Sequence, residues 1–299
     1  MEGQIRTIVR NKITDALAAP VPRMTRRDVR LPGIRGKAIA VIGMRRTGKT
    51  TFLWQVLGDR LAGGTGREGL LYFNFEDERL FGMGAQDLQL VLEEYYRLHP
   101  EWRDRRRATF FFDEIQVVPG WERFARRILD TEQVDLFLSG SSARLLSREV
   151  ATSMRGRAME AQVFPFSFRE YLRHRGAEPE KPSGRLPKAE RSALEKYFRE
   201  YLATGGFPEA QGVSSRIRAE LLRSFVDATL LRDVIERHAV SHPVALRWVA
   251  VQLLSNAAGL FSVNKFWNAL RRNNRCVRVR WSVRNLITTD MGRLICWPA

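Results

Sequence analysis

The chain has 299 residues, of which 44% are apolar and 28% charged, a composition typical of a folded protein with a sizeable core. No apolar run approaches the roughly 18 residues that a membrane-spanning helix needs, and residues 1–20 lack the apolar centre of a signal peptide. We therefore expect a cytoplasmic protein of about two domains that has no membrane partner.

The formal net charge of +17 is the most unusual feature of the composition. Such a charge attracts nucleic acid or other anionic surfaces. However, arginine greatly outnumbers lysine and is scattered along the chain, which is also what an arginine-rich genome composition produces. Nucleic acid therefore stays an open candidate partner.

Cysteine and histidine do not indicate a disulfide framework or a metal centre. Cys276 and Cys296 are the two cysteines, and we interpret them as reduced thiols. His238 and His242 are four residues apart, which is a metal-binding spacing on a helix. Pro243 follows at once and no third ligand lies nearby, so we interpret the pair as the end of a helix.

The first half of the chain alternates short apolar runs with segments of helical periodicity. Such alternation predicts parallel βαβ units with helices on both faces of the sheet. We expect strands at residues 37–42, 69–75, 108–112, 135–138 and 160–164. We expect helices at residues 49–61, 85–98 and 121–129.

The pattern changes near residues 164–167, after which helical patterns dominate. They cover residues 167–175, 188–203, 215–237 and 244–257, with a Pro- and Gly-rich loop at 176–187. We expect four parts: a lead segment at 1–34, an α/β domain at 35–165, a helical lid and winged-helix-like C-terminal domain at 166–270, and a basic tail at 271–299.

Residues 43–50 read GMRRTGKT and match the phosphate-binding pattern G-x-x-x-x-G-K-[ST], the Walker A motif. The match follows an apolar strand and opens a helix, which is the context that the motif requires. Its glycines let the backbone fold around phosphate oxygens, Lys49 supplies a charge at the β- and γ-phosphates, and the Thr50 hydroxyl is a ligand for Mg²⁺. We expect the nucleotide to contact Gly43, Met44, Arg45, Arg46, Thr47, Gly48, Lys49, Thr50 and Thr51.

The strand at residues 108–112 ends in Asp113 and Glu114, as a Walker B motif does. In that position Asp113 would hold Mg²⁺ through its water shell, and Glu114 would act as general base toward the attacking water. An adjacent glutamate favours an ATPase over a GTPase.

Three further segments contain candidate contacts for the nucleotide. Ser139 ends the fourth strand and is a candidate for contact with the γ-phosphate or the water, while the serines after it could simply cap the next helix. Arg155 and Arg157 precede the fifth strand, and either could stabilise charge on the γ-phosphate or be a solvated loop residue. Residues 25–28 are a candidate contact for the adenine base.

The sheet pattern, the Asp113–Glu114 pair and the turn after the fourth strand resemble the AAA+ branch of P-loop ATPases. Residues 139–172, which include SGSSARLLSRE and FPFSFREYL, are similar to a group of prokaryotic ATPases that carry a C-terminal domain of unknown function. YLATGGFPEA at 201–210 and LLRDV at 230–234 also resemble that group. The resemblance covers about residues 30–270 and implies the strand order 5-1-4-3-2. Ser139 departs from the Asn or Thr that is more typical at its position.

We therefore expect a Mg-dependent AAA+-like ATPase with ATP and Mg²⁺ as cofactors, a homo-oligomer as one option, and an unknown conformational output. The catalytic candidates are Lys49, Glu114, Ser139 and Arg157, and the metal candidates are Thr50 and Asp113. The alternative is a nucleotide-dependent DNA-binding protein with negligible turnover.

The sequence changes character near residue 270. Residues 271–299 hold seven arginines against one acid, Asp290, together with both cysteines. Related ATPases would continue with another helix, a hairpin and a further domain. We expect a truncated or frameshifted tail, with a short basic β-hairpin at residues 276–283 as the alternative.

Overall fold

The computed structural model describes residues 2–140, 154–180, 187–235, 240, 243–256, 262 and 264–265. The chain divides into two compact units, Met1–Leu221 and Leu222–Ala299. Several predictions lie outside the described residues: those for Ser141 and Ser142, the serines after Ser139, and those for His238, His242, both cysteines and the tail after residue 270. The four-part division of the chain stays a prediction.

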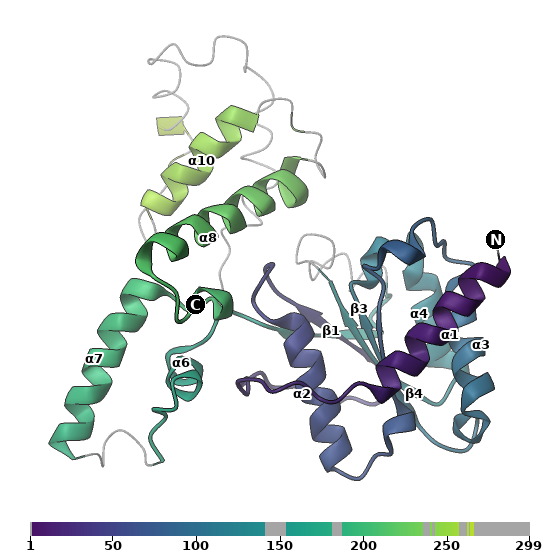
Figure 1. Ribbon diagram of the computed structural model, residues 1–299. Helices are drawn as coiled ribbons and strands as arrows, with labels where there is room; N and C mark the ends of the chain where they lie inside the picture. The colour runs from purple at the N-terminus through teal and green to yellow at the C-terminus, as the bar shows by residue number, and fades with distance from the viewer. Residues whose placement is uncertain are drawn as a thin grey trace. The chain divides into compact units, whose positions relative to one another are not determined.

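The first unit is built on a five-stranded parallel sheet (Figure 1). Its strands are β1 (Ala38–Ile42), β2 (Leu70–Asn74), β3 (Ala108–Asp113), β4 (Val134–Ser139) and β5 (Ala158–Gln162). Their order is β2-β3-β4-β1-β5, which confirms the α/β class and the predicted order 5-1-4-3-2. Because all strands run the same way, the segments that follow β1, β3 and β4 meet at one edge of the sheet.

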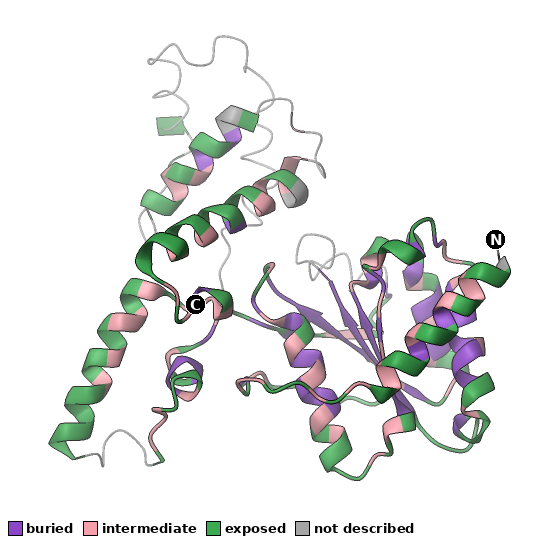
Figure 2. Ribbon diagram, viewed as in Figure 1, coloured by how far each residue is buried: buried purple, intermediate pink, exposed green. Residues whose placement is uncertain are grey.

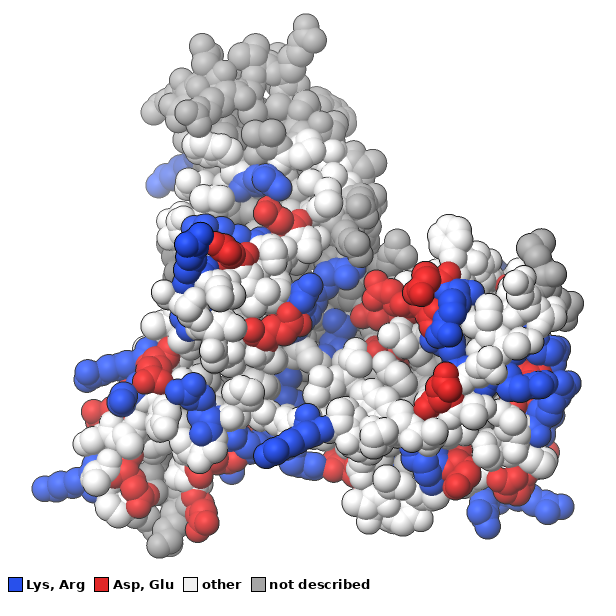
Figure 3. All heavy atoms as spheres, in the orientation of Figure 1, with Lys and Arg blue, Asp and Glu red and all other residues white. Residues whose placement is uncertain are grey.

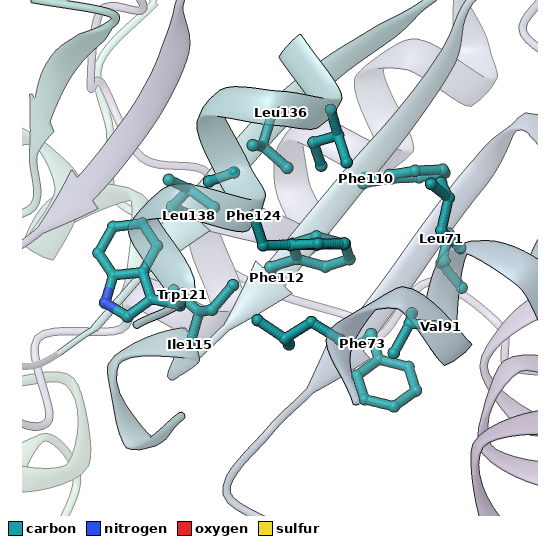
Figure 4. Packing of buried hydrophobic residues seen from close by; sticks show 14 of the residues in the cluster. Leu71, Phe73, Val91, Phe110, Phe112, Ile115, Trp121, Phe124, Leu136 and Leu138 are labelled. Carbon is teal, nitrogen blue, oxygen red and sulfur yellow. The ribbon is translucent and has the colours of Figure 1, made fainter. Parts of the chain in front are cut away.

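Side chains of the central strands alternate between two cores, as the two-residue period of a strand requires. Phe110 and Phe112 of β3 lie in the larger core, which contains Trp121 and Phe124 at the start of α4 (Figure 4). Phe111 points to the opposite face and packs with Phe137 at 5.1 Å between ring centroids. Helix α2 (Lys49–Ala62) covers this second face, while α3 (Leu88–Leu98) and α4 (Trp121–Thr131) cover the first.

Helix α1 (Glu2–Ala18) also packs on the first face, and the sequence patterns did not predict it. Its Val9 and Ile13 are fully buried in the larger core. Arg6 and Arg10 reach the two oxygens of Glu94 on α3, each at 2.8 Å. The lead segment is therefore part of the folded first unit.

The remaining helices are α6 (Phe168–His174), α7 (Lys188–Thr204), α8 (Ser215–Ala228) and α10 (Pro243–Ser255). The division between the units falls within α8, and the predicted helix at 215–237 is α8 followed by a π-helical stretch, Thr229–Ile235. Helix α7 has no buried residue, and Figure 2 shows it as exposed and intermediate along its length. Short 3₁₀ turns cover Arg67–Gly69, Glu78–Leu80, Pro100–Trp102, Ile115–Val117 and Pro208–Ala210.

Within the described part of the chain, no helix combines the length and apolar character needed to cross a membrane. The same residues contain no group of three or more His, Cys, Asp or Glu side chains placed to hold a metal ion.

Candidate nucleotide-binding site

The loop of residues 43–48 connects β1 to α2 and is closed by close backbone contacts. A Cβ atom on Gly43 would collide with the Val163 carbonyl oxygen, so only glycine fits there. Gly48 caps α2 with φ +92°, a conformation that favours glycine. The loop thus delivers the amino end of a helix, with its N–H groups and its partial positive charge, to the carboxyl edge of the sheet.

The side chains of the loop are ordered by one of its own carbonyl groups. Thr47 donates to the Met44 carbonyl at 2.9 Å, and the Lys49 ammonium approaches the same oxygen at 3.1 Å. Lys49 is buried, with 6% of its surface exposed. Its charge is therefore held over the loop rather than in solvent, which suits a contact with phosphate.

Asp113 is fully buried and accepts hydrogen bonds from three hydroxyl groups. Thr50 and Tyr72 each donate to Oδ2 at 2.7 Å, and Ser139 donates to Oδ1. Three predicted residues, Thr50, Asp113 and Ser139, are thus brought together from three elements. Tyr72 was not predicted, because an aromatic residue on a strand has an ordinary structural explanation. Burial, together with Asp113, raises the pKa of Tyr72 and keeps its phenol protonated as a donor.

The Thr50–Asp113 pair fits a magnesium ion. A hydroxyl oxygen and a carboxylate oxygen 2.7 Å apart, beside the charge of Lys49, are the hard oxygen ligands that Mg²⁺ takes in proteins.

Glu114 begins the segment after β3 in a left-handed backbone conformation, with φ 53° and ψ 36°. The Gln116 side-chain amide donates to its carboxylate. Burial raises the pKa of the Glu114 carboxyl above its ordinary value, while the Gln116 amide and the Lys49 charge act in the opposite direction. A carboxylate with a raised pKa, next to the loop lysine, has the properties of a general base.

Arg155 and Arg157 lie at the amino ends of the parallel strands, opposite the carboxyl ends where the loop lies. The Arg157 carbonyl accepts from the N–H of Ala38, the first residue of β1, whereas the loop follows the last residue of that strand. Five residues of strand separate the two edges by about 16 Å. Arg157 also forms an ion pair with Asp130 at 2.5 Å. An arginine placed there does not reach the loop of residues 43–48 in its own chain.

Glu209 of the GGFPE segment forms an ion pair of 2.5 Å with Arg46 of the loop. The segment is itself fixed, because the N–H of Phe166 donates to the Gly206 carbonyl at 2.7 Å. A Cβ atom on Gly206 would collide with the Phe166 carbonyl oxygen, and Gly205 has φ +73°. Gly206 is therefore required for the close approach to Phe166, and Gly205 for the left-handed backbone that precedes it.

Comparison with known families adds a second line of evidence. Residues 35–172 match the family model described as an AAA domain. This range contains all five strands, the loop and the Asp113–Glu114 pair. The membership of the narrower, GGFPE-containing group stays a prediction.

The chain is also similar to curated proteins. An uncharacterized protein of Methanocaldococcus jannaschii is 33% identical over 253 residues, which cover 84% of this chain and 54% of that protein. An uncharacterized protein of Haemophilus influenzae is 30% identical over 231 residues, covering 77% and 54%. The chain spans about half the length of these relatives.

Two solved structures resemble it more distantly. C. elegans PCH-2 aligns with a TM-score of 0.37 and 13% identity, covering 74% of this chain and 60% of that one. The Aeropyrum pernix ORC1 protein, solved in complex with DNA, aligns with a TM-score of 0.34 and 17% identity, covering 91% and 76%.

Proposed function

We propose that the P-loop AAA-like domain of residues 35–172 binds MgATP and hydrolyses it to ADP and phosphate. The observation that carries the proposal is the meeting of Thr50, Asp113 and Ser139 at the carboxyl edge of the sheet, beside the buried Lys49. Candidate nucleotide, metal and catalytic residues from three elements converge there, at the carboxyl ends of the strands, where open parallel sheets bind ligands.

The chemistry follows from the positions of the side chains. Lys49 and the loop N–H groups bind the β- and γ-phosphates, and Glu114 accepts a proton from a water that attacks the γ-phosphorus. The bond between the γ-phosphorus and the bridging oxygen then breaks, and ADP is the leaving group. Mg²⁺, held by Thr50 and Asp113, would neutralise charge that develops on the phosphate oxygens. Ser139 holds the Asp113 carboxylate and, at 3.3 Å, accepts from the N–H of Glu114. We assign Ser139 to positioning the Asp113 carboxylate and the Glu114 backbone.

The distance of Arg157 from its own loop supports action on a neighbouring subunit. If the protein assembles with the amino edge of one sheet facing the loop of the next, Arg157 would approach the neighbour's γ-phosphate. We propose a homo-oligomeric ATPase on this basis.

The central test is ATP binding by the variant Lys49→Ala. Loss of the charge facing the β- and γ-phosphates should weaken binding of a fluorescent ATP analogue by more than about tenfold, since contacts of charged groups are among the stronger ones. Lys188→Ala, at an exposed lysine that begins α7, is the matched control and should bind like the wild type. If the wild type and both variants bind the analogue with equal affinity, Lys49 does not contact the phosphates and the site assignment is wrong.

A further inference from the structure

Arg27 lies behind the phosphate-binding loop and is almost fully buried, with 4% of its surface exposed. It comes from the lead segment, 20 residues before Thr47 in the chain. The backbone at Arg27 is held by Gln55 of α2: the Arg27 N–H donates to the Gln55 amide oxygen at 2.6 Å, and the Gln55 amide donates back to the Arg27 carbonyl at 3.1 Å. The side chain is thereby aimed at the loop.

The Arg27 guanidinium makes contacts in three directions. Its Nη1 donates to the Thr47 carbonyl at 2.7 Å, and its Nη2 donates to the Phe164 carbonyl at 2.5 Å. Its Nε and Nη2 face the two oxygens of Glu170, at 3.0 and 3.4 Å. The planar fork of an arginine can satisfy all these acceptors at once, which a single ammonium group cannot do.

Glu170 in turn holds the beginning of α6. It accepts from the N–H of Ser167 at 2.8 Å and from the N–H of Asp28 at 2.7 Å, and Ser167 accepts from the N–H of Glu170 to complete a capping box. One buried ion pair therefore connects the loop, the end of the segment after β5 and the first turn of α6.

The contact with Thr47 controls the peptide between Thr47 and Gly48. A trans peptide is planar, so its carbonyl oxygen and its N–H point in opposite directions. With the Thr47 oxygen held by Arg27, the N–H of Gly48 points away from Arg27. Gly48 has φ +92°, and a glycine can rotate this peptide at low cost unless a neighbour holds it. Arg27 lies close to Gly48, because a Cβ atom added to Gly48 would be only 3.3 Å from Arg27 Nη1.

We propose that Arg27 is a positioning residue for ATP binding: it fixes the Thr47–Gly48 peptide so that the Gly48 N–H is presented to the phosphates, and it couples this peptide to α6 through Glu170. The proposal rests on the proposed function, since it concerns the same phosphate-binding loop. Arg27 does not itself contact the nucleotide. It acts through the backbone that does.

The decisive variant is Arg27→Lys, which keeps a positive charge beside Glu170 but lacks the fork that reaches Thr47 and Phe164. We expect the KM for ATP to rise about tenfold or more, with kcat changed less than about threefold, because a phosphate contact that is equal in ground and transition states is lost. Hydrogen exchange of the peptide covering residues 43–50 should become faster than in the wild type, by more than any fall in the Tm without nucleotide speeds exchange in the rest of the first unit.

Arg60→Lys is the matched control. Arg60 is a partly buried arginine of α2 that donates to Thr109 and Asp135, both at 2.7 Å, in the last turn of the helix and thus away from the loop. Its variant should leave the KM and the exchange of residues 43–50 unchanged. If both arginine variants behave alike, the effect belongs to general stability and the proposal is wrong.

Should Arg27→Lys fail to fold, the double variant Arg27→Gln, Glu170→Gln takes its place, because it buries no unpaired charge. It too must raise the KM and speed the loop exchange. Wild-type values in the folded variant overturn the role of Arg27. A wild-type protein that does not bind ATP would instead overturn the proposed function, so the two failures are distinguishable.

Discussion

Glu114 allows nucleotide binding to be separated from chemistry. The variant Glu114→Gln retains the shape of the side chain and loses the base, so ATP should bind as in the wild type. Turnover should fall by at least about 10²-fold, the usual contribution of a general base. Binding is measured with fluorescent ATP and turnover by phosphate release. If turnover is unaffected, Glu114 is not the base.

The raised pKa of Glu114 adds a dependence on pH. A general base works only when deprotonated, so kcat should fall as the pH drops through the pKa of the Glu114 carboxyl. Because burial raises that pKa, the fall should begin at a higher pH than for an ordinary glutamate. The weak remaining turnover of Glu114→Gln should lack this acid limb. An identical limb in the variant would assign it to another group.

Helix α1 gives a prediction about stability. Ile13 is fully buried in the larger core, so Ile13→Ala should lower the free energy of unfolding by about 2–5 kcal/mol, as measured by urea denaturation. Asn11→Ala, at an exposed position of the same helix, is the control and should change it little. If Ile13→Ala changes the free energy of unfolding as little as Asn11→Ala does, α1 does not contribute to the core.

The elements of the sheet were predictable because their signals are local. An apolar strand, a glycine turn and a helix follow one another within residues 37–61, and the βαβ pattern repeats the argument. Helix α1 was not predicted, because its core positions, among them Val9 and Ile13, are interrupted by charged residues that pair with α3. The contact of Arg27 with Glu170 joins residues 143 positions apart, and no short-range pattern indicates it.

The site, too, was predictable only where its signals are local in the sequence. Lys49, Thr50 and Asp113 are indicated by motifs whose spacing reflects the chemistry. The hydrogen bonds from Tyr72 and Ser139 to Asp113 depend on the strand register, in which Asn74 pairs with Asp113 and Phe112 with Leu138. Register is set by the packing of whole strands, so it becomes visible only in the folded chain.

Assembly can be tested by mixing two inactive proteins. If Arg157 acts on a neighbouring subunit, Arg157→Ala should still bind ATP but turn it over poorly. Mixing it with Lys49→Ala should restore part of the activity, because intact half-sites then meet at mixed interfaces. Arg107→Ala, another exposed arginine at the amino edge of the sheet, should be active alone. The absence of any restored turnover would contradict action between subunits.

The net charge of +17 gives the last test. In Figure 3, positive and negative side chains are mixed over the visible face of the described residues. If the excess nevertheless serves nucleic acid, the affinity for a labelled oligonucleotide should fall with salt, with a log–log slope of about −0.7 to −0.9 for each phosphate contacted. Fluorescence anisotropy at several salt concentrations measures this slope. If the oligonucleotide does not bind at low salt, the excess charge reflects an arginine-rich composition and not a nucleic-acid-binding surface.

Because the backbone at Glu114 is left-handed, stability and activity favour different residues at this position. A residue with a Cβ atom loses about 1 kcal/mol or more in that conformation, whereas glycine adopts it freely and asparagine more easily than most. If Glu114 is the general base, as proposed, a laboratory selection for heat resistance alone would favour Gly or Asn at position 114 and yield stable proteins that bind ATP without hydrolysing it. Only a selection that also demands turnover would retain the glutamate.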